Sequence, residues 1–264
     1  MFVIPADRLP VGFAERLEAP PAEPAPALPA ATVVLLRDAV AGPEVLLLRR
    51  VQSAGFVPGA FVFPGGRVDL ADADPALLDW CEGIGDAAPG LAAVFRVAAI
   101  RETFEETGVL LAVGDVVAGS ELELWRERLL SGEAGLLEVA ESLGVRFALD
   151  ALVHCAHWIT PEIEPRRYDT HFFLARLPEG VEVRVDPREM SAAVWLTPAR
   201  ALELFRSGEL PLVFPTAATL KSLIGFGTVG EALAAFRGRA IRPILPRLVR
   251  TAAGVGIVVE PPAE

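Results

Sequence analysis

The sequence predicts a protein of the α/β or α+β class, in which strands and helices pack around one core. Three observations favour this class: aliphatic and β-branched runs end in turn residues, longer segments have helical periodicity, and the two kinds are mixed along the chain. The 264 residues are 52% hydrophobic, which is enough to form a core without disulfide bonds. The length favours one domain with extensions.

A proline-rich arm and then three strands are predicted for the N-terminal part. Residues 17–29 include five prolines and have no periodicity, so residues 1–29 are expected to form an extended arm. Ala31–Arg37 and Glu44–Arg50 are aliphatic runs separated by an Ala-Gly-Pro turn, which predicts two connected strands. Phe61–Pro64 is expected to be a further short strand.

Helices and strands follow one another in the rest of the chain. Residues 70–90 are acidic and rich in glycine and proline near their end, which predicts a loop with a short helical segment around Ala76–Cys81. Leu91–Thr107 has helical periodicity and is followed by Gly108, a natural C-cap. Further helices are expected at 119–131, 134–143 and Pro198–Ser207, and further strands at Ala151–Ile159, Tyr168–Leu177, Ala193–Leu196 and Ala252–Val259.

Charge and composition exclude several classes of partner. The formal net charge of −11 leaves no basic surplus to neutralise nucleic-acid phosphates, so no nucleic-acid partner is expected. No uncharged apolar run approaches the ~18 residues that a membrane span requires. Cys81 and Cys155 are the two cysteines, and the N-terminal residues lack the pattern of a signal peptide. The expected location is the cytoplasm.

Three carboxylates gather on one side of the predicted Leu91–Thr107 helix. Glu102, Glu105 and Glu106 fall within an arc of about 100°. An isolated acidic arc is most often a solvated helix face. Here the preceding turns of the same side are apolar, so another part of the protein must cover that side. These apolar residues are Leu91, Val94, Phe95 and Ala98, and the opposite, core-facing stripe consists of Ala93, Val97, Ile100 and Phe104.

The close packing of these carboxylates indicates a cation site. Like charges packed together destabilise a protein unless cations compensate them, and hard divalent ions with oxygen ligands are the expected compensation. Arg101 stands four residues before Glu105 and can orient its carboxylate. Upstream, Gly65 and Gly66 let the backbone approach a ligand closely, and a carbonyl there can serve as a hard ligand.

At these residues the chain resembles the Nudix hydrolases. The signature of that family is G-x5-E-x7-R-E-U-x-E-E-x-G-U, where U is an aliphatic residue. Gly66 matches its first glycine, Arg101–Gly108 matches R-E-U-x-E-E-x-G, and Val109 matches the final aliphatic residue. The chain departs from the signature in having Asp72 for the first glutamate and Thr103 for an aliphatic residue.

A long insertion within the signature is similar to one branch of the family, which includes a peroxisomal coenzyme A diphosphatase. Thirty-four residues separate Gly66 from Arg101 where the signature has 13, and the insertion is expected at about 73–90. Members that cleave coenzyme A have the preceding motif L-L-T-x-R-[SA]-x3-R-x3-G-x3-F-P-G-G. The chain matches this motif at Leu46, Leu47, Arg50, Gly59 and 63–66, and differs at Leu48, Val51 and Gly55.

The resemblance implies a fold and a reaction. The fold would be a mixed β-sheet between helices, formed by residues 30–225, with residues 226–264 as a C-terminal extension packed on this domain. The reaction would be hydrolysis of the diphosphate in a small nucleoside-diphosphate derivative, with coenzyme A or acyl-coenzyme A as the expected substrate. The cofactor would be Mg²⁺ or Mn²⁺.

The resemblance also implies roles for individual residues. The metal ligands would be Glu102, Glu105, Glu106, the Gly65 carbonyl and Asp72. The residues assigned to catalysis are Arg101 and a proton acceptor, which is either Glu102 or the loop residue Glu189. Contacts to the substrate are expected from Arg50, Gly66, Arg166 and Arg167.

Two alternatives to this function stay open. An ADP-ribose, NADH or nucleotide-sugar pyrophosphatase would share the metal site but not the substrate pocket. A non-catalytic, ligand-binding regulator of the same fold would lack one or more of the helix carboxylates, whereas all three are present here, which favours an enzyme. A homodimer is compatible with the sequence. His154, His157 and His171 are expected to be ordinary strand residues rather than ligands.

Overall fold

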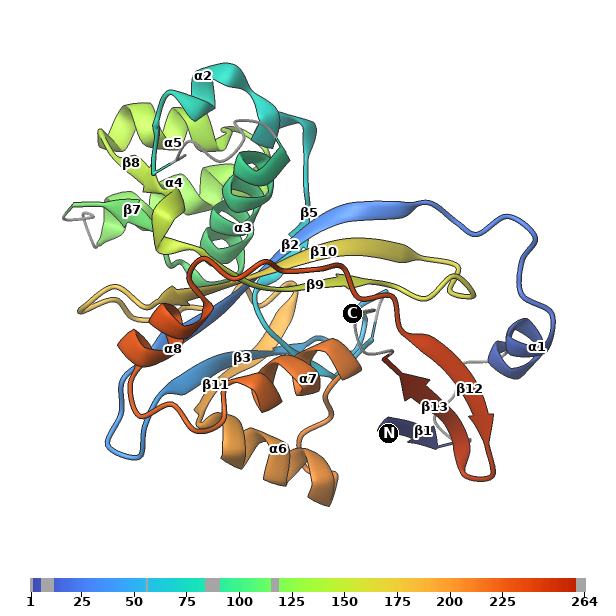
Figure 1. The fold of residues 1–264 in the computed structure, drawn as a ribbon. Coiled ribbons are helices and arrows are strands. Elements are labelled where there is room, and N and C mark those ends of the chain that lie inside the picture. Colours follow the sequence, from blue (N-terminus) through green and yellow to red (C-terminus); the bar gives the residue numbers. More distant parts are fainter. Residues whose placement is uncertain (1, 6–11, 56, 84–90, 115–118, 260–264) are drawn as a thin grey trace.

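The computed structural model describes residues 2–5, 12–55, 57–83, 91–114 and 119–259 (Figure 1). Its strands are β1 (Phe2–Pro5), β2 (Ala27–Arg37), β3 (Glu44–Arg50), β4 (Phe61–Val62), β5 (Gly65–Arg67), β6 (Cys81–Glu82), β7 (Ala112–Val113), β8 (Arg146–Ala148), β9 (Val153–Ile159), β10 (Arg167–Arg176), β11 (Met190–Leu196), β12 (Arg247–Thr251) and β13 (Gly254–Val258). Its α-helices are α1 (Phe13–Glu18), α2 (Pro75–Leu78), α3 (Leu91–Thr107), α4 (Ser120–Ser131), α5 (Leu136–Leu143), α6 (Pro198–Ser207), α7 (Phe214–Ser222) and α8 (Val229–Phe236), and its 3-10 turns are η2 (Leu70–Ala73) and η3 (Leu149–Ala151).

The central sheet is mixed and is split near its middle. Its strand order is β11-β3-β2-β10-β9, and β10 runs parallel to β2 whereas the other neighbours on this path are antiparallel. β2 and β3 pair only at Leu36↔Val45 and Arg37↔Glu44 and then diverge. Past this point β5 pairs with β2 and β4 pairs with β3. The divergence opens a gap in the sheet that β4, β5 and the turn between them border.

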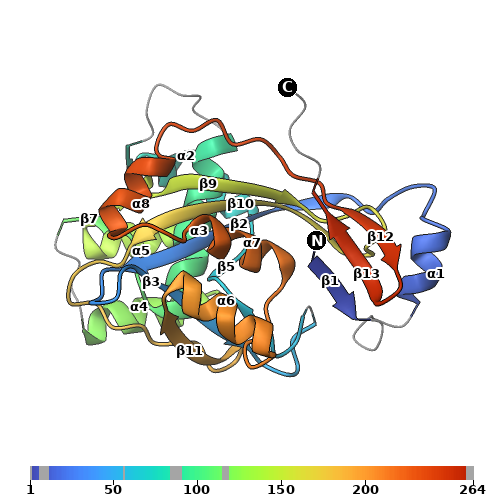
Figure 2. The same ribbon diagram turned by 60° about the horizontal axis from the view of Figure 1, so that its bottom comes forward.

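Helices cover both faces of this sheet (Figure 1 and Figure 2). Side chains alternate along β2: Val33 and Leu35 belong to the hydrophobic cluster under α3, while Val34 and Leu36 belong to the cluster under α7 and α8. All four side chains have no exposed surface. Burial on both faces explains why β2 and β3 read as continuous aliphatic runs rather than as alternating patterns. The fold class predicted from the sequence is confirmed.

Two smaller sheets lie outside the central one. In the first, β13 pairs with both β1 and β12, so segments from the two ends of the described chain meet. In the second, β8 pairs with β6 and β7 beside α3. No helix in the described ranges is both long enough and apolar enough to cross a membrane.

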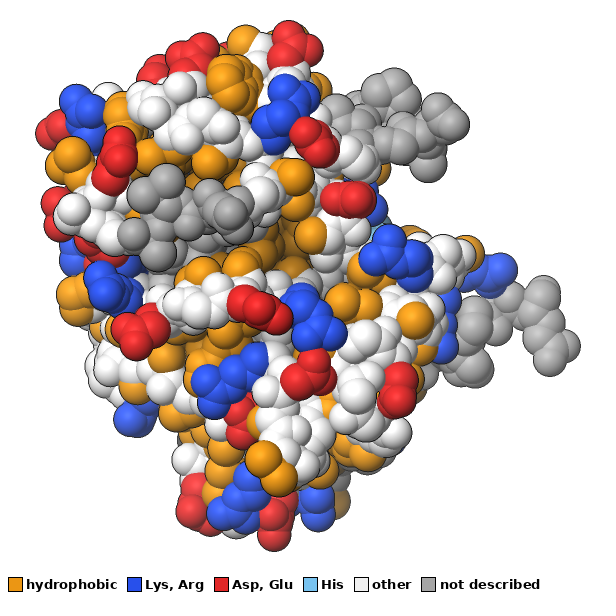
Figure 3. Space-filling view, turned by 90° about the vertical axis from the view of Figure 1, so that its left-hand side faces the viewer, with side chains coloured by type: hydrophobic (Ala, Val, Ile, Leu, Met, Phe, Trp, Pro, Cys, Tyr) orange, Lys and Arg blue, Asp and Glu red, His pale blue; other side chains and the backbone are white. Residues whose placement is uncertain are grey.

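The surface carries charges of both signs. On the face shown in Figure 3, acidic and basic side chains are interspersed among apolar ones, and the basic side chains do not merge into a continuous patch. A nucleic acid would need such a patch to neutralise its phosphates.

Several elements agree with the sequence predictions to the residue. The bounds of β3, α3 and α6 are those expected, and the predicted strand at the C-terminal end is β13. The predicted arm at residues 1–29 contains elements that the sequence did not indicate, because β1 pairs with β13 and β2 already pairs with β10 from Ala27. The predicted insertion at 73–90 contains α2 and β6, and its residues 84–90 lie outside the described part of the chain.

Candidate active site

A cleft of about 450 Å³ opens where β2 and β3 diverge. Residues of β2, β4, β5, α3, β9, β10 and α7 line it, together with Glu189 just before β11 and Ile257 in β13. The cleft therefore lies at the centre of the fold, where the sheet, the helix with the carboxylates and the C-terminal strand meet.

Two of the three predicted helix carboxylates line this cleft. Glu102 and Glu106 border it from α3, whereas Glu105 lies beside Arg101. Glu106 is only 4% exposed, and its Oε2 accepts a hydrogen bond from the Gly65 amide at 3.0 Å. This bond joins the last turns of α3 to Gly65 and Gly66, which we call the glycine turn. The helix carboxylates and the glycines that the sequence predicted for the site are therefore in contact.

Arg101 holds the carboxylates of the site in position. Its Nη1 donates to Glu102 at 2.9 Å and to Glu105 at 3.2 Å, and its Nη2 donates to the Arg67 carbonyl at 2.8 Å. Its Nε and Nη2 bind the two oxygens of Asp72 at 2.8 and 2.9 Å. Because Asp72 is 1% exposed and both of its oxygens face Arg101, the carboxylate orients the guanidinium group.

The glycine turn leaves space only for glycine. A Cβ added at Gly66 would lie 2.4 Å from the carboxylate of Glu102. A Cβ at Gly65 would lie 2.4 Å from the Ala31 carbonyl oxygen, and the φ of +155° at Gly65 also disfavours a side chain. The two glycines thus let β5 approach both β2 and the carboxylates of α3.

A loop docked on the end of α3 brings Glu189 to the cleft. The Asp186 amide donates to the Glu106 carbonyl at 3.1 Å, and the Val51 amide donates to the Glu189 carbonyl at 2.9 Å. The loop is therefore fixed both to the helix and to the end of β3. Glu189 lines the cleft with Glu102 and Glu106, as expected from the sequence for a further acidic residue.

Burial makes the charged form of these carboxylates costly. Burial raises the pKa of Glu106 well above its usual range, and repulsion from Glu102 and Glu189 adds to the effect. Burial likewise raises the pKa of Glu102, against the opposing influence of Arg101. The pKa of Glu105 rises to about 7, mainly through burial.

Two of the four predicted substrate contacts lie in the cleft wall. Arg50 lines the cleft, and within the described part of the chain its buried Nε has no hydrogen-bond partner. Gly66 lines it as well. The cleft thus brings the unpartnered Nε of Arg50 and the closely packed backbone of Gly66 next to the carboxylates of α3.

The other two predicted contacts bind backbone carbonyls instead. The Arg166 guanidinium donates to the Gly55 carbonyl at 3.2 Å. The Arg167 guanidinium donates to the Thr160 and Ala25 carbonyls at 3.0 and 2.8 Å. Neither arginine is among the described residues that line the cleft.

The apolar part of the cleft was not predicted from the sequence. Its aromatic residues are Phe63, Trp158, Tyr168, Phe172 and Phe214. Trp158 is 7% exposed, packs edge-on against Phe214, and has a buried Nε1 without a partner among the described residues. Strand alternation predicts that Tyr168 and Phe172 share a face, but the sequence does not indicate that this face borders a cleft.

Arg126 of α4 is a second residue that sequence reasoning missed. Its Nε and Nη2 donate to the Glu105 carbonyl at 3.1 and 2.8 Å, and its side chain is 3% exposed. The contact satisfies a carbonyl in the last turn of α3, next to Glu106. Nothing in the local pattern of α4 distinguishes this arginine from a surface residue.

The chain is similar to proteins of known family. A family model described as the NUDT19 Nudix domain matches residues 81–223. The human protein named acyl-coenzyme A diphosphatase NUDT19 is 31% identical over 265 residues, which cover 81% of this chain and 70% of the human protein. The Xenopus laevis protein of the same name is 29% identical over 71% of this chain, and the match spans 61% of that relative's length.

A solved structure agrees with this relationship. The crystal structure of a NUDIX hydrolase from Alicyclobacillus acidocaldarius matches with a TM-score of 0.72 and 33% identity, over 81% of this chain and 99% of that one. Because the family model covers more than half of the chain and the human relative is similar over most of it, the chain belongs to the Nudix hydrolases, in the family of the NUDT19 Nudix domain.

Proposed function

We propose that the chain is a metal-dependent diphosphatase that hydrolyses coenzyme A or acyl-coenzyme A to 3′-phospho-AMP and phosphopantetheine or its acyl derivative. The observation that carries this proposal is a cleft that joins a carboxylate cluster to Arg50 and to an aromatic wall. A diphosphate fits the charged part, while a pantetheine or acyl chain fits the apolar part. The names of the relatives, acyl-coenzyme A diphosphatase, support the same substrate class.

The donor groups of the cleft fit Mg²⁺ or Mn²⁺. Glu102, Glu106 and the Gly65 carbonyl in the cleft, together with Glu105 on the next part of α3, would hold the ions, since all four offer hard oxygen ligands. Burial without enough compensating cations raises the pKa of these carboxylates, and a bound cation would relieve that cost. When bound, the ions would neutralise the diphosphate and lower the pKa of an attacking water.

The protein's own groups position the substrate and accept a proton. Arg50 binds a phosphate oxygen, because its unpartnered Nε lies in the cleft wall. Glu102 or Glu189 accepts the proton of the attacking water, since both line the cleft. Arg101 keeps Glu102 in position through its hydrogen bond, and Asp72 acts on Arg101 rather than on a metal ion.

Arg166 provides a candidate contact for the 3′-phosphate. A Cβ at Gly55 would lie 3.2 Å from Nη1 of Arg166. The guanidinium of Arg166 thus occupies the space next to Gly55, the position at which the motif for coenzyme A cleavage has an arginine. We infer that Arg166 takes over this positive charge, because a guanidinium group can bind a phosphate through two parallel charge-assisted hydrogen bonds.

The experiment compares kcat/KM for coenzyme A, dephospho-coenzyme A and ADP-ribose at one Mn²⁺ concentration, with Glu106→Gln as the inactive control. Coenzyme A is expected to be preferred, and excess EDTA is expected to abolish turnover while the fold remains. A tenfold preference for ADP-ribose, equal to about 1.4 kcal/mol of transition-state stabilisation, would instead establish the alternative pyrophosphatase. Full turnover in EDTA would refute the metal-dependent mechanism.

A further inference from the structure

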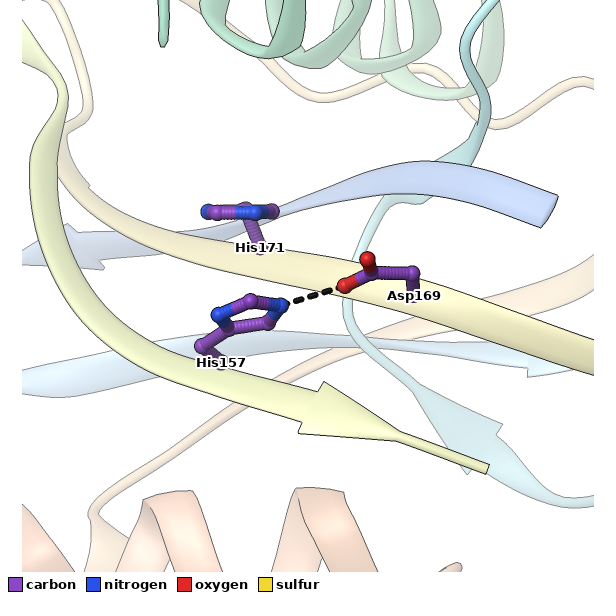
Figure 4. A group of neighbouring side chains, drawn as sticks. All are labelled: His157, Asp169 and His171. Carbon is purple, nitrogen blue, oxygen red and sulfur yellow. Dashed lines mark hydrogen bonds and ion pairs between the residues drawn. The ribbon is translucent and has the colours of Figure 1, made fainter. Parts of the chain in front are cut away.

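All three histidines of the chain lie together on β9 and β10, and two of them are drawn with Asp169 in Figure 4. On β10, Asp169 and His171 alternate with Tyr168, Thr170 and Phe172, which line the cleft. The histidines therefore face away from the cleft and toward α3, where the ring centroid of Phe95 lies 4.1 Å from that of His171. This cluster has no part in the proposed hydrolysis.

The geometry brings three potential ligand atoms close to one another. Nε2 of His157 contacts Oδ1 of Asp169, and the rings of His157 and His171 stack with their centroids 4.0 Å apart. One ligand atom from each of the three residues lies within 4.8 Å of the others. Ligands around a tetrahedral zinc ion are separated by about 3.3 Å, so the three atoms must move slightly closer together and reorient to hold an ion between them.

We propose that His157, Asp169 and His171 form a binding site for a divalent transition-metal ion, with Zn²⁺ as the preferred ion. Two imidazole nitrogens and one carboxylate oxygen are a ligand set that Zn²⁺ accepts, and water completes the fourth position. The carboxylates in the cleft offer oxygen ligands alone, which suit Mg²⁺ or Mn²⁺. The two sites would thus select different ions by the chemistry of their ligands. A bound ion would also clamp β9, at the edge of the sheet, to β10.

A second histidine interaction supports the assignment. Nδ1 of His171 lies 3.1 Å from Nε2 of His154. When the Nδ1–H of His171 donates to His154, Nε2 of His171 carries the free lone pair that a metal requires. His154 is then an outer partner, meaning a residue that orients a metal ligand without itself binding the ion. The imidazole planes of His157 and His171 differ by only 27°, so binding requires one ring to turn until both lone pairs converge.

Arg96 of α3 lies beside the histidines. Burial lowers the pKa of His154 and of His171 to about 4, and the charge of Arg96 contributes to both shifts, so this guanidinium also repels an ion. It lies over the ring of Phe173, 5.2 Å from the centroid. The carboxylate of Asp169 supplies the opposing negative charge within the ligand set itself.

The test is a calorimetric titration of the metal-free chain with Zn²⁺ in excess Mg²⁺. We expect one equivalent to bind with a micromolar or lower Kd. His171→Asn and Asp169→Asn should each weaken binding at least tenfold, and His154→Gln about tenfold, the usual effect of losing an outer partner. Glu102→Gln and the surface variant Glu203→Gln serve as controls and should leave the Kd unchanged.

A second readout separates ligation from loss of folding. Zn²⁺ should raise the melting temperature of the wild-type protein but not that of His157→Asn, and the circular dichroism of the metal-free variants should match that of the wild type. Co²⁺ added in place of Zn²⁺ should give visible absorption that His171→Asn abolishes. The proposal is overturned if no stoichiometric binding occurs below 100 µM, taken as roughly the limit for a specific site, or if Glu102→Gln abolishes binding while His171→Asn does not.

Discussion

Glu106 lies in the cleft with 4% of its surface exposed and accepts a hydrogen bond from Gly65. Replacement by glutamine keeps the shape but removes the charge. We expect Glu106→Gln to lower kcat by about 10²-fold or more, the usual scale for losing a metal or acid–base function. Its free energy of unfolding should stay the same or rise, because burial disfavours the charge.

The measurement for Glu106→Gln is kcat with Mn²⁺ and coenzyme A, together with urea unfolding. Glu203→Gln is the matched control, since Glu203 pairs with Arg200 on the exposed surface of α6. A Glu106→Gln rate within a factor of about two of the wild type would contradict the assignment of the cleft, because loss of an acid–base or metal function is far larger.

Gly66 offers a test of the close approach between β5 and α3. In Gly66→Ala the added Cβ meets the Glu102 carboxylate at 2.4 Å, so the carboxylate must move. We expect kcat to fall more than about tenfold while the protein stays folded, because displacement of a reacting group by about 1 Å has effects of this size or larger. Gly230→Ala in α8 is the control: its Cβ makes ordinary contacts, so turnover and stability should stay close to those of the wild type. Normal turnover by Gly66→Ala would show that Glu102 need not hold its position.

At the scale of elements, the pair of Asp72 and Arg101 joins η2 to α3. Asp72→Asn removes the carboxylate that binds Nε and Nη2 of Arg101, while Glu102 and Glu105 still contact Nη1. We therefore expect the free energy of unfolding to fall by about 1–3 kcal/mol, and turnover to fall as Glu102 loses its support. Asp69→Asn is the control, because the Asp69 side chain is 59% exposed and 3.7 Å from Arg101. Urea unfolding of both variants provides the comparison, and equal stabilities would assign Asp72 no positioning role.

The elements that the sequence predicted are those whose start and end are determined by the residues within them. Helix α3 is apolar over its first turns on both sides and has Gly108 at its end, so its bounds follow from local pattern. β5 is Gly65–Arg67, which has no strand propensity, and it forms because the free edge of β2 accepts it. The residues within a segment do not indicate pairing of this kind, because it depends on a distant strand.

The same distinction applies to the site. Glu102 and Glu106 were predictable because their spacing places them on one side of a helix. The two oxygens of Asp72 both bind Arg101, 29 residues further along, and Trp158 lines the cleft from β9, a strand far from α3 along the chain. Those arrangements depend on how separate elements pack, so neither spacing nor residue type indicates them.

The whole molecule has one cysteine in each hydrophobic layer. Cys81 belongs to the cluster on the α3 side of the sheet, and Cys155 belongs to the cluster on the other side. Burial raises the pKa of the Cys81 thiol to about 11 and raises the pKa of the Cys155 thiol further above its usual range. Since the thiolate is the reactive form, we expect both thiols to react very slowly with iodoacetamide near pH 8 in the native protein.

In urea, both thiols should become reactive with one shared midpoint, because the two layers pack on a single sheet. Variants that keep one thiol, Cys81→Ala and Cys155→Ala, report the two layers separately. A lower midpoint for the thiol of Cys81 would show instead that the layer with α3 opens before the rest. Rapid labelling without urea would contradict the burial of either residue.

The pairing of β1 with β13 determines how the molecule responds to a pulling force. Phe2 lies opposite Ile257 and Pro5 lies opposite Gly254 in an antiparallel ladder. A load that pulls these two strands apart from the end with Phe2 and Ile257 would break the hydrogen bonds of the ladder one at a time. This sequential rupture needs less force than breaking all of them at once by shear. Ile257 also borders the cleft and is paired with Leu248 of β12, so we expect such a load to release β1 before it disturbs the cleft wall or the carboxylates on α3.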